Sequence, residues 1–205
     1  KEAVRKLSKY MNFWDRHIDL LIASHPDADH VGGFPEIIEK YEFDYFLKNN
    51  NVSKTSYFKE LERRLDGERV SDLKTGDKIY VEDNVYILVI YPDIDTTDIE
   101  ANTSSIVFKL VYERKEVEDF SVLFMGDAPI KIENYLVDLF PEILRSDILV
   151  VGHHGSKTST GEKLLKVVEP RYSVITVGRV NSYGHPLKKV LENLGKWGGE
   201  ILRTD

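Results

Sequence analysis

Apolar runs of strand length alternate along the chain with segments in which apolar residues recur at helical spacing. The predicted strands are residues 17–23, 43–47, 77–81, 85–91, 104–112, 120–125, 148–151, 172–177 and 200–202. The predicted helices are residues 2–11, 34–41, 55–65, 130–140, 158–168 and 187–196, and Gly67 is the predicted stop of the third. This alternation, with no linker or repeat, predicts one α/β domain over residues 1–205.

Histidines and aspartates follow the predicted strands in four places, and we take these loops as the candidate site. The first is Ser24–Gly33, a predicted loop with four metal-capable side chains: His25, Asp27, Asp29 and His30. The other three are Asp127, the pair His153 and His154, and His185, each beside a glycine. Imidazole and carboxylate groups are the ligands of zinc, manganese and iron sites. Only His17 lies outside these loops, and we expect it to be structural.

A pair of metal ions explains this arrangement physically. Two ions about 3.5–4 Å apart need a carboxylate that bridges them, and they activate a water near neutral pH. A lone aspartate from a separate strand, such as Asp127, suits the bridging role. Two structural alternatives stay open: Asp127 as a turn residue and His185 as a helix cap.

Composition limits the functional classes. The chain has no cysteine, which excludes disulfides, thiolate metal ligands and a cysteine nucleophile. Its net charge of −7 argues against a generic nucleic-acid coating protein. Residues 151–205 nevertheless carry nine Lys or Arg against five Asp or Glu, a balance of +4. No apolar run approaches the ~20 residues of a transmembrane helix. The chain starts without Met, and we expect it to be a fragment.

Gly155–Thr160 leads into a predicted helix, and its residues Ser156, Lys157 and Thr158 suit a phosphate at a helix N-terminus. An ordinary Ser/Thr helix cap is the alternative. Tyr183 and Arg179 are candidates to contact a base or a phosphate. No aromatic residues interleave with basic ones as a stacking platform, so sequence-specific reading of nucleic acid is not expected.

The four loops together resemble a known family. The pattern His25-x-Asp27-x-Asp29-His30-x-Gly32-Gly33 is similar to the His-x-His-x-Asp-His signature of the metallo-β-lactamase superfamily, with Asp in place of the second His. With Gly126-Asp127, Gly152-His153-His154-Gly155 and Gly184-His185-Pro186, it resembles the hydrolase domain of ComEC-type competence DNA-uptake proteins and their stand-alone relatives.

The resemblance implies a four-layer αββα sandwich and a set of residue roles. His25 and Asp27 would serve one metal, Asp29 and His30 the other, and Asp127 would bridge them. A histidine of the 153–154 pair would complete the second site. His153 is favoured as the ligand because it follows the strand directly. Asp29, His154 and His185 are the candidate catalytic residues, with His185 as a further ligand or a proton donor.

Two departures from the family pattern change the expectation. Asn102 stands on a loop where many members have a ligand His, and we assign it to the substrate. Together with Asp27 this makes the site richer in oxygen, which favours manganese or magnesium over zinc. The strands that usually open the fold are absent, so we expect the full protein to be longer at both ends.

We therefore expect a hydrolase that uses one or two divalent ions and a metal-activated water to cut phosphodiester bonds in an anionic substrate, single-stranded DNA. A hydrolase of lactones, thioesters or β-lactams is the first alternative, and a domain that binds DNA or a partner without turnover is the second. The resemblance places the chain in a membrane-attached DNA-uptake protein, or in a stand-alone cytoplasmic hydrolase. The sequence identifies no protein partner.

Overall fold

The computed structural model describes residues 2–65 and 69–205, and the predicted helix stop Gly67 lies outside these residues. The chain divides into two compact units. The first contains residues 1–73 and 94–104, and the second contains residues 74–93 and 105–205. The helices of the described residues are all too short or too polar to span a lipid bilayer.

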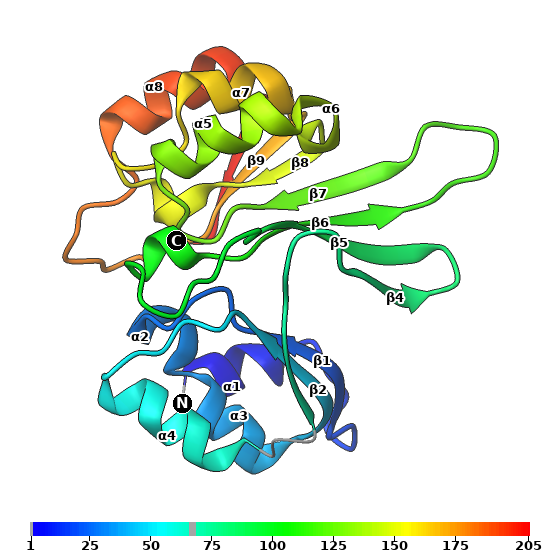
Figure 1. Ribbon diagram of the computed structural model, residues 1–205, viewed down its shortest axis with the longest axis vertical. Helices are drawn as coiled ribbons and strands as arrows, with labels where there is room; N and C mark the ends of the chain where they lie inside the picture. The colour runs from blue at the N-terminus through cyan, green and yellow to red at the C-terminus, as the bar shows by residue number, and fades with distance from the viewer. Residues whose placement is uncertain (1, 66–68) are drawn as a thin grey trace. The chain divides into compact units, whose positions relative to one another are not determined.

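The first unit is a small parallel sheet with helices (Figure 1). Its elements are α1 (Glu2–Leu7), β1 (His17–Ile22), α2 (Ala28–Val31), α3 (Phe34–Lys40), β2 (Glu42–Lys48), α4 (Ser56–Arg64), β3 (Val70–Asp72) and η2 (Asn102–Ser104). The strands pair in parallel in the order β1-β2-β3. Phe43 and Phe46 of β2 pack with Phe58 and Leu61 of α4 in one apolar cluster. Burying each such side chain contributes roughly 1.5–3 kcal/mol.

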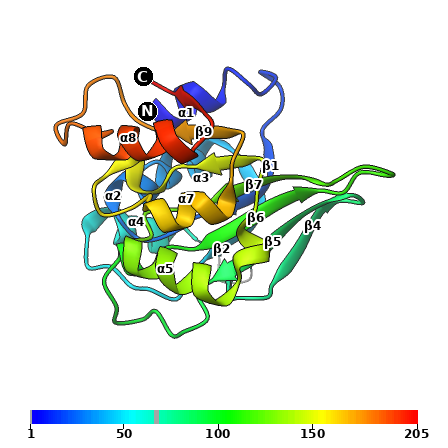
Figure 2. The same ribbon diagram turned by 90° about the horizontal axis from the view of Figure 1, so that it is seen from above.

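The second unit is a seven-stranded mixed sheet with its helices on one face (Figures 1 and 2). Its strands are β4 (Lys78–Glu82), β5 (Val85–Tyr91), β6 (Val107–Tyr112), β7 (Phe120–Phe124), β8 (Ile148–Val150), β9 (Tyr172–Ile175) and β10 (Glu200–Arg203). Its helices are α5 (Ile130–Leu139), α6 (Pro141–Leu144), η3 (Gly152–Gly155), α7 (Glu162–Val168) and α8 (Lys188–Trp197). The sheet order is β10-β9-β8-β7-β6-β5-β4.

The direction of the strands decides where functional side chains gather in the second unit. Strands β7, β8, β9 and β10 pair in parallel, whereas β4 to β7 pair antiparallel. The carboxyl ends of parallel neighbours lie at one edge of a sheet. The loops that follow β7, β8 and β9 therefore share an edge, and each carries a predicted site residue.

The structure confirms the α/β class and most predicted elements, with local differences. The predicted loop 24–33 contains the short helix α2, because the backbone N–H groups of His30 and Val31 donate to the carbonyl of Asp27. Gly32 ends this helix, and a Cβ there would lie 2.5 Å from the Ala28 carbonyl oxygen, so only glycine fits. The short elements β3, α6 and η2 were not predicted.

The helix predicted over residues 158–168 begins later, at Glu162. Thr160 has a φ of 58°, in the left-handed region, which a helix cannot continue through. The sequence gives no sign of this, because Ser and Thr before an apolar periodic segment are typical of a helix start.

Candidate functional site

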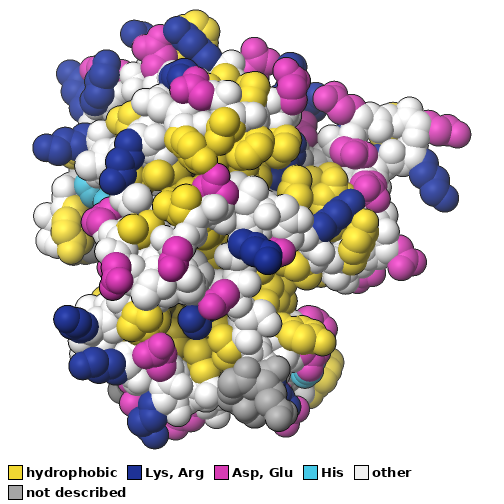
Figure 3. Space-filling model, in the orientation of Figure 1, with side chains coloured by type: hydrophobic (Ala, Val, Ile, Leu, Met, Phe, Trp, Pro, Cys, Tyr) yellow, Lys and Arg dark blue, Asp and Glu magenta, His cyan; other side chains and the backbone are white. Residues whose placement is uncertain are grey.

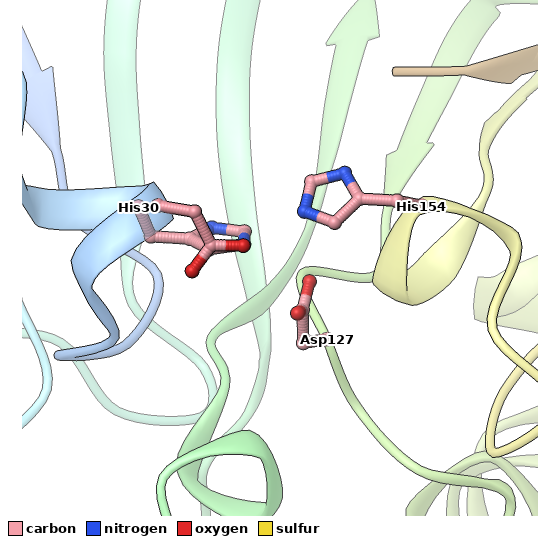
Figure 4. A group of neighbouring side chains, drawn as sticks. His30, Asp127 and His154 are labelled. Carbon is pink, nitrogen blue, oxygen red and sulfur yellow. The ribbon is translucent and has the colours of Figure 1, made fainter. Parts of the chain in front are cut away.

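The first group of candidate ligands is His25, Asp27, Asp29 and His30, which follow β1 in the first unit. Asp27 precedes the first residue of α2, and Asp29 and His30 lie in that helix. Figure 4 shows the His30 side chain projecting from this short helix. The helix is brief, and Gly32 is its C-terminal cap.

Ser24 orients both histidines of this group. Its hydroxyl oxygen lies 3.0 Å from Nδ1 of His25 and 3.2 Å from Nδ1 of His30. The two rings are 4.0 Å apart between centroids. A hydroxyl has one hydrogen and two lone pairs, so it can accept from both Nδ1–H groups. In that tautomer each Nε2 carries a lone pair, which is the form of histidine that binds a metal ion.

The aspartates of the first group lie beside these nitrogens. Nε2 of His25 is 3.8 Å from a carboxylate oxygen of Asp27, and Nε2 of His30 is 4.0 Å from a carboxylate oxygen of Asp29. The His25 side chain is fully buried, whereas the Asp29 side chain is 61% exposed. The first group thus pairs each imidazole with one carboxylate of its own loop.

The second group is Asp127, His153, His154 and His185, in the loops after β7, β8 and β9 of the second unit. Asp127 is only 3% exposed, and its backbone N–H donates to the Ser105 hydroxyl at 3.0 Å. The N–H of His153 donates to the Gly126 carbonyl at 3.0 Å, which joins two of the loops. Figure 4 shows the Asp127 carboxylate next to the His154 ring.

His153 and His154 are both close to Asp127, but their rings are held differently. Nε2 of His153 lies 3.5 Å from the Asp127 carboxylate, and its Nδ1 lies 3.1 Å from the Thr158 hydroxyl. His154 offers a ring nitrogen within 4.8 Å of an Asp127 oxygen. Its Nδ1 lies 2.6 Å from the Thr176 carbonyl oxygen. A carbonyl only accepts, so Nδ1 of His154 carries the hydrogen and Nε2 carries the lone pair.

The backbone of this histidine pair is strained. His153 and His154 have φ values of 49° and 53°, in the region that favours glycine. This costs roughly 1–2 kcal/mol per residue. Gly155 follows with a φ of 82°, and a Cβ there would lie 2.5 Å from the Pro186 side chain. Such strain persists where packing enforces it, and it is common at functional sites.

The backbone of His185 is held by hydrogen bonds, whereas a nitrogen of its ring is left without one. The Asn181 side chain accepts the N–H of His185 at 2.8 Å and donates to its carbonyl at 3.0 Å. Within the described residues, the buried Nδ1 of His185 has no hydrogen-bond partner. Burial, followed by the neighbouring His153 and His154, lowers the pKa of His185. The Tyr183 ring, 78% exposed, lies parallel to the His185 ring at 5.8 Å.

The predicted substrate residues lie in different settings. Ser156 is buried, and its hydroxyl lies 3.0 Å from that of Thr158, which in turn contacts His153. Lys157 is exposed. Asn102 lies in η2 of the first unit, and its buried side-chain oxygen has no hydrogen-bond partner among the described residues.

A buried carboxylate already occupies the start of α7. Glu133 of α5 is 1% exposed and accepts the N–H groups of Thr160 at 2.5 Å and Gly161 at 2.8 Å. Burial raises the pKa of Glu133 to about 7, although these two hydrogen bonds lower it. The N–H groups of Thr160 and Gly161, just before this helix, are therefore bonded within the protein and are not open to a phosphate.

His17 is the first residue of β1 and belongs to neither group. Its Nε2 is 3.0 Å from the Asp44 carboxylate, and this hydrogen bond raises the pKa of His17. Asp19 also offers an oxygen within 4.8 Å, but all three side chains are exposed. Exposed pairs of this kind contribute little stability.

Sequence reasoning missed four residues that hold the candidate ligands or their loops. They are Ser24, Asn49, Glu133 and Asn181. Asn49 is buried and donates to the carbonyls of Ser24 and Ser104, which fixes the start of the first loop. Its position directly after an apolar strand was the available signal, but three consecutive asparagines read as an ordinary turn.

The donor sets fit a divalent metal ion on chemical grounds. Each group combines carboxylate oxygen with imidazole nitrogen, and second partners orient the Nδ1 atoms of His25, His30 and His154. Metal-binding histidines in proteins usually have such a partner on the other ring nitrogen.

The fold is the metallo-β-lactamase fold. The chain is similar to the metallo-β-lactamase fold protein YhfI of Bacillus subtilis, with a TM-score of 0.53 and 10% identity over 97% of this chain and 80% of that one. It is also similar to Igni18, a metallo hydrolase from the archaeon Ignicoccus hospitalis, with a TM-score of 0.53 and 13% identity over 91% of this chain and 76% of that one. No family model matches the sequence.

Within this fold, the sequence relatives are competence and recombination proteins. The chain is 30% identical to ComE operon protein 3 of Bacillus subtilis over 93% of its length, and 29% identical to competence protein ComA of Neisseria gonorrhoeae over 93%. It is 31% identical to recombination protein 2 of Haemophilus influenzae over 91%. It spans 24%, 24% and 21% of these relatives. The resemblance to ComEC-type proteins is confirmed.

Proposed function

We propose that the chain is a metal-dependent phosphodiester hydrolase that acts on single-stranded DNA during DNA uptake. The observation that carries the proposal is the pairing of buried Asp127 with His154, whose Nδ1 is anchored on the Thr176 carbonyl. Such an anchored imidazole beside a buried carboxylate is half of a metal site. The first group supplies the same ligand types from its own loop.

We assign the ligands as follows. His25, Asp27, Asp29 and His30 would serve as ligands from the first unit, and Asp127 and His154 would serve as ligands from the second. When bound, the ions supply Lewis acidity and lower the pKa of water toward neutrality. His154 replaces His153 as our proposed ligand, because only the His154 ring has a partner that fixes its tautomer.

The remaining side chains would hold the ligands in place, transfer a proton and contact the substrate. Ser24 holds His25 and His30, and Thr158 holds His153 close to Asp127. His185 is the proposed further ligand or proton donor, and its buried Nδ1 has no hydrogen-bond partner among the described residues. Tyr183 and Lys157 are exposed, and they are the proposed contacts to a base and a phosphate.

Two observations support DNA as the substrate. The relatives are named as competence and recombination proteins, although the chain covers only about a quarter of each. Residues 151–205, which contain three of the proposed site histidines, carry a charge balance of +4 in a chain of net charge −7. A positive region beside a hydrolytic site attracts an anionic polymer.

Manganese is the proposed ion. Asp27, Asp29 and Asp127 give the site more carboxylate oxygen than a three-histidine zinc site has. Oxygen-rich ligand sets favour manganese or magnesium over zinc.

Cleavage of a labelled single-stranded oligonucleotide tests the proposal, with manganese, magnesium, zinc or EDTA. We expect cleavage with manganese, none with EDTA, and a loss of more than about 100-fold in Asp127→Asn. The matched control is Asp83→Asn, an exposed aspartate in the turn after β4, which should keep full activity. Cleavage that survives EDTA, or that Asp127→Asn leaves unchanged, would contradict the proposal.

One observation favours a second candidate, a hydrolase of esters that lack phosphate. Glu133 accepts the N–H groups of Thr160 and Gly161, so these two groups before α7 are not offered to a phosphate. A lactone, a thioester and a β-lactam should therefore be assayed beside the oligonucleotide. Metal-dependent turnover of one of them, without oligonucleotide cleavage, would select this candidate.

A further inference from the structure

The outer surface of α7 and α8 carries a strip of lysines. The two helices lie side by side on the sheet of the second unit (Figures 1 and 2). Figure 3 shows Lys and Arg side chains gathered over α8. We call the exposed residues Lys166, Lys188, Lys189 and Lys196 the basic strip.

The strip has more positive charge than its own acidic neighbours can balance. Lys166 pairs with Glu162 at 2.7 Å, and Lys188 lies 3.9 Å from Glu192. The pKa of Glu162 is lowered by its hydrogen bond to Lys166 and further by the charges of Lys196 and Lys189. Within the described residues, the ion pairs of these two helices with their own acidic residues are those of Lys166 and Lys188, and neither Lys189 nor Lys196 has one. Two ammonium charges therefore stay unpaired on this surface.

The strip contains a hollow beside an aromatic ring. The hollow has a volume of about 450 Å³, and its lining includes Lys166, Lys196 and Trp197. The Lys166 ammonium lies 4.7 Å from the centroid of the Trp197 ring, which is 42% exposed. Glu169 also lines the hollow, but it pairs with Arg145 at 3.1 Å. This size is within the range of small-molecule sites.

The strip also begins at the second group of candidate ligands. Helix α8 starts three residues after His185. The N–H of Leu187, just before the helix, donates to the Gly155 carbonyl at 3.0 Å. The lysines at the start of α8 are thus tied to the loop that holds His153 and His154.

We propose that the basic strip binds the phosphodiester backbone of single-stranded nucleic acid and leads it to the second group. The choice of substrate rests on the proposed function, but the binding is separate from cleavage. Charge complementarity selects this partner, because the strip is locally positive in a chain of net charge −7. A lipid surface fits less well, since Trp197 is the exposed large apolar side chain of the two helices and Lys166 lies over its ring.

Fluorescence anisotropy of a labelled 20-nucleotide oligothymidine, measured in EDTA so that no cleavage occurs, tests the proposal. The double variant Lys189→Glu with Lys196→Glu should weaken binding at least about 10-fold and reduce the salt slope by about 0.7 for each lost phosphate contact. Lys54→Glu with Lys59→Glu makes the same change in net charge at exposed lysines outside the strip and should change affinity less than about 2-fold.

The outcomes separate the strip from the hydrolase. Equal affinity of the two double variants would overturn the proposal, as would strip-dependent binding to phosphatidylserine vesicles without binding to the oligonucleotide. A milder pair, Lys189→Gln with Lys196→Gln, should weaken binding in the same direction, and it serves if the Glu variants unfold. If binding depends on the strip but no cleavage is seen, the proposed hydrolase function is wrong and the proposed binding surface is supported. If cleavage requires Asp127 but the strip variants bind like the parent chain, the hydrolase function is supported and the proposed binding surface is wrong.

Discussion

At the scale of single residues, Ser24 and Thr176 contact Nδ1 of three histidines, and the Thr176 carbonyl leaves Nε2 of His154 as the nitrogen that can bind a metal ion. The Ser24 hydroxyl contacts Nδ1 of His25 and His30, and the Thr176 carbonyl contacts Nδ1 of His154. A partner on Nδ1 holds the ring orientation, and a partner that only accepts, such as a carbonyl, also fixes the tautomer. Ser24 lies in the predicted loop 24–33, but a serine beside a histidine has no distinctive spacing, so the sequence alone does not reveal its role.

Replacing Ser24 by alanine tests this orienting role. Ser24→Ala should lower the affinity for manganese by about 10- to 100-fold, because the Nδ1 atoms lose their shared partner. Calorimetric titration of the metal measures the effect. Ser8→Ala, at an exposed serine after α1, is the control and should bind like the parent chain. Unchanged affinity in Ser24→Ala would show that the hydroxyl does not orient the ligands.

The histidine pair gives a second test at this scale. We expect His154→Gln to lose metal binding and cleavage by more than about 100-fold, and His153→Gln to lose less, because the Thr176 carbonyl fixes only the His154 ring. Titration of both variants with manganese shows which of the two histidines is the metal ligand. A larger loss in His153→Gln would restore the assignment that the sequence favoured.

At the scale of elements, the contact between α5 and the start of α7 is the least expected feature. Glu133 accepts two backbone N–H groups, at Thr160 and Gly161, from a buried position. The loop it holds also carries Thr158, the partner of His153. The sequence predicted a helix start and a phosphate at this point, and both expectations followed from the Ser/Thr pattern alone. A carboxylate 28 residues earlier in the chain cannot be assigned to that start from local pattern.

Glu133 makes the stability of the chain depend on pH. Its folded pKa is raised from 4.5 to about 7, so the folded state favours the protonated form. This contribution is fully present below pH 4.5 and is lost as the pH rises toward 7. It amounts to roughly 3 kcal/mol at most.

Urea unfolding of the metal-free chain between pH 4.5 and 8 checks this sign. Glu133→Gln should flatten the fall in unfolding free energy that the parent chain shows over that window. Glu62→Gln, at an exposed glutamate of α4, should leave the fall unchanged. A parent chain whose stability rises with pH across the window, with no effect of Glu133→Gln, would contradict the assignment.

At the scale of the whole molecule, the sequence predicted the fold class because its strands and helices differ clearly in apolar period. The strand β5 matches its predicted bounds, and β7 and β8 differ from theirs by one residue. Site loops were predictable for the same reason, since Asp127, His153 and His185 follow apolar strands whose ends share an edge. Tertiary partners such as Asn49 with Ser104, separated by 55 residues, have no trace in local pattern.

The charge distribution is also a property of the whole chain that composition partly revealed. The excess of +4 in residues 151–205 was visible in the sequence, but its concentration on α7 and α8 required the fold. Charges four residues apart on one helix pair with each other, as Lys166 does with Glu162. The unpaired charges of Lys189 and Lys196 are those that remain for a partner.

The central claim is that this chain hydrolyses phosphodiester bonds with a water activated by divalent metal. Cleavage of a single-stranded oligonucleotide with manganese in ¹⁸O-labelled water tests it most directly, by mass spectrometry of the products. We predict one solvent oxygen in the terminal phosphate of each cut, and no cut in EDTA or in Asp127→Asn. A product phosphate without the label, or a chain that binds manganese at these residues and cuts nothing, would contradict the claim.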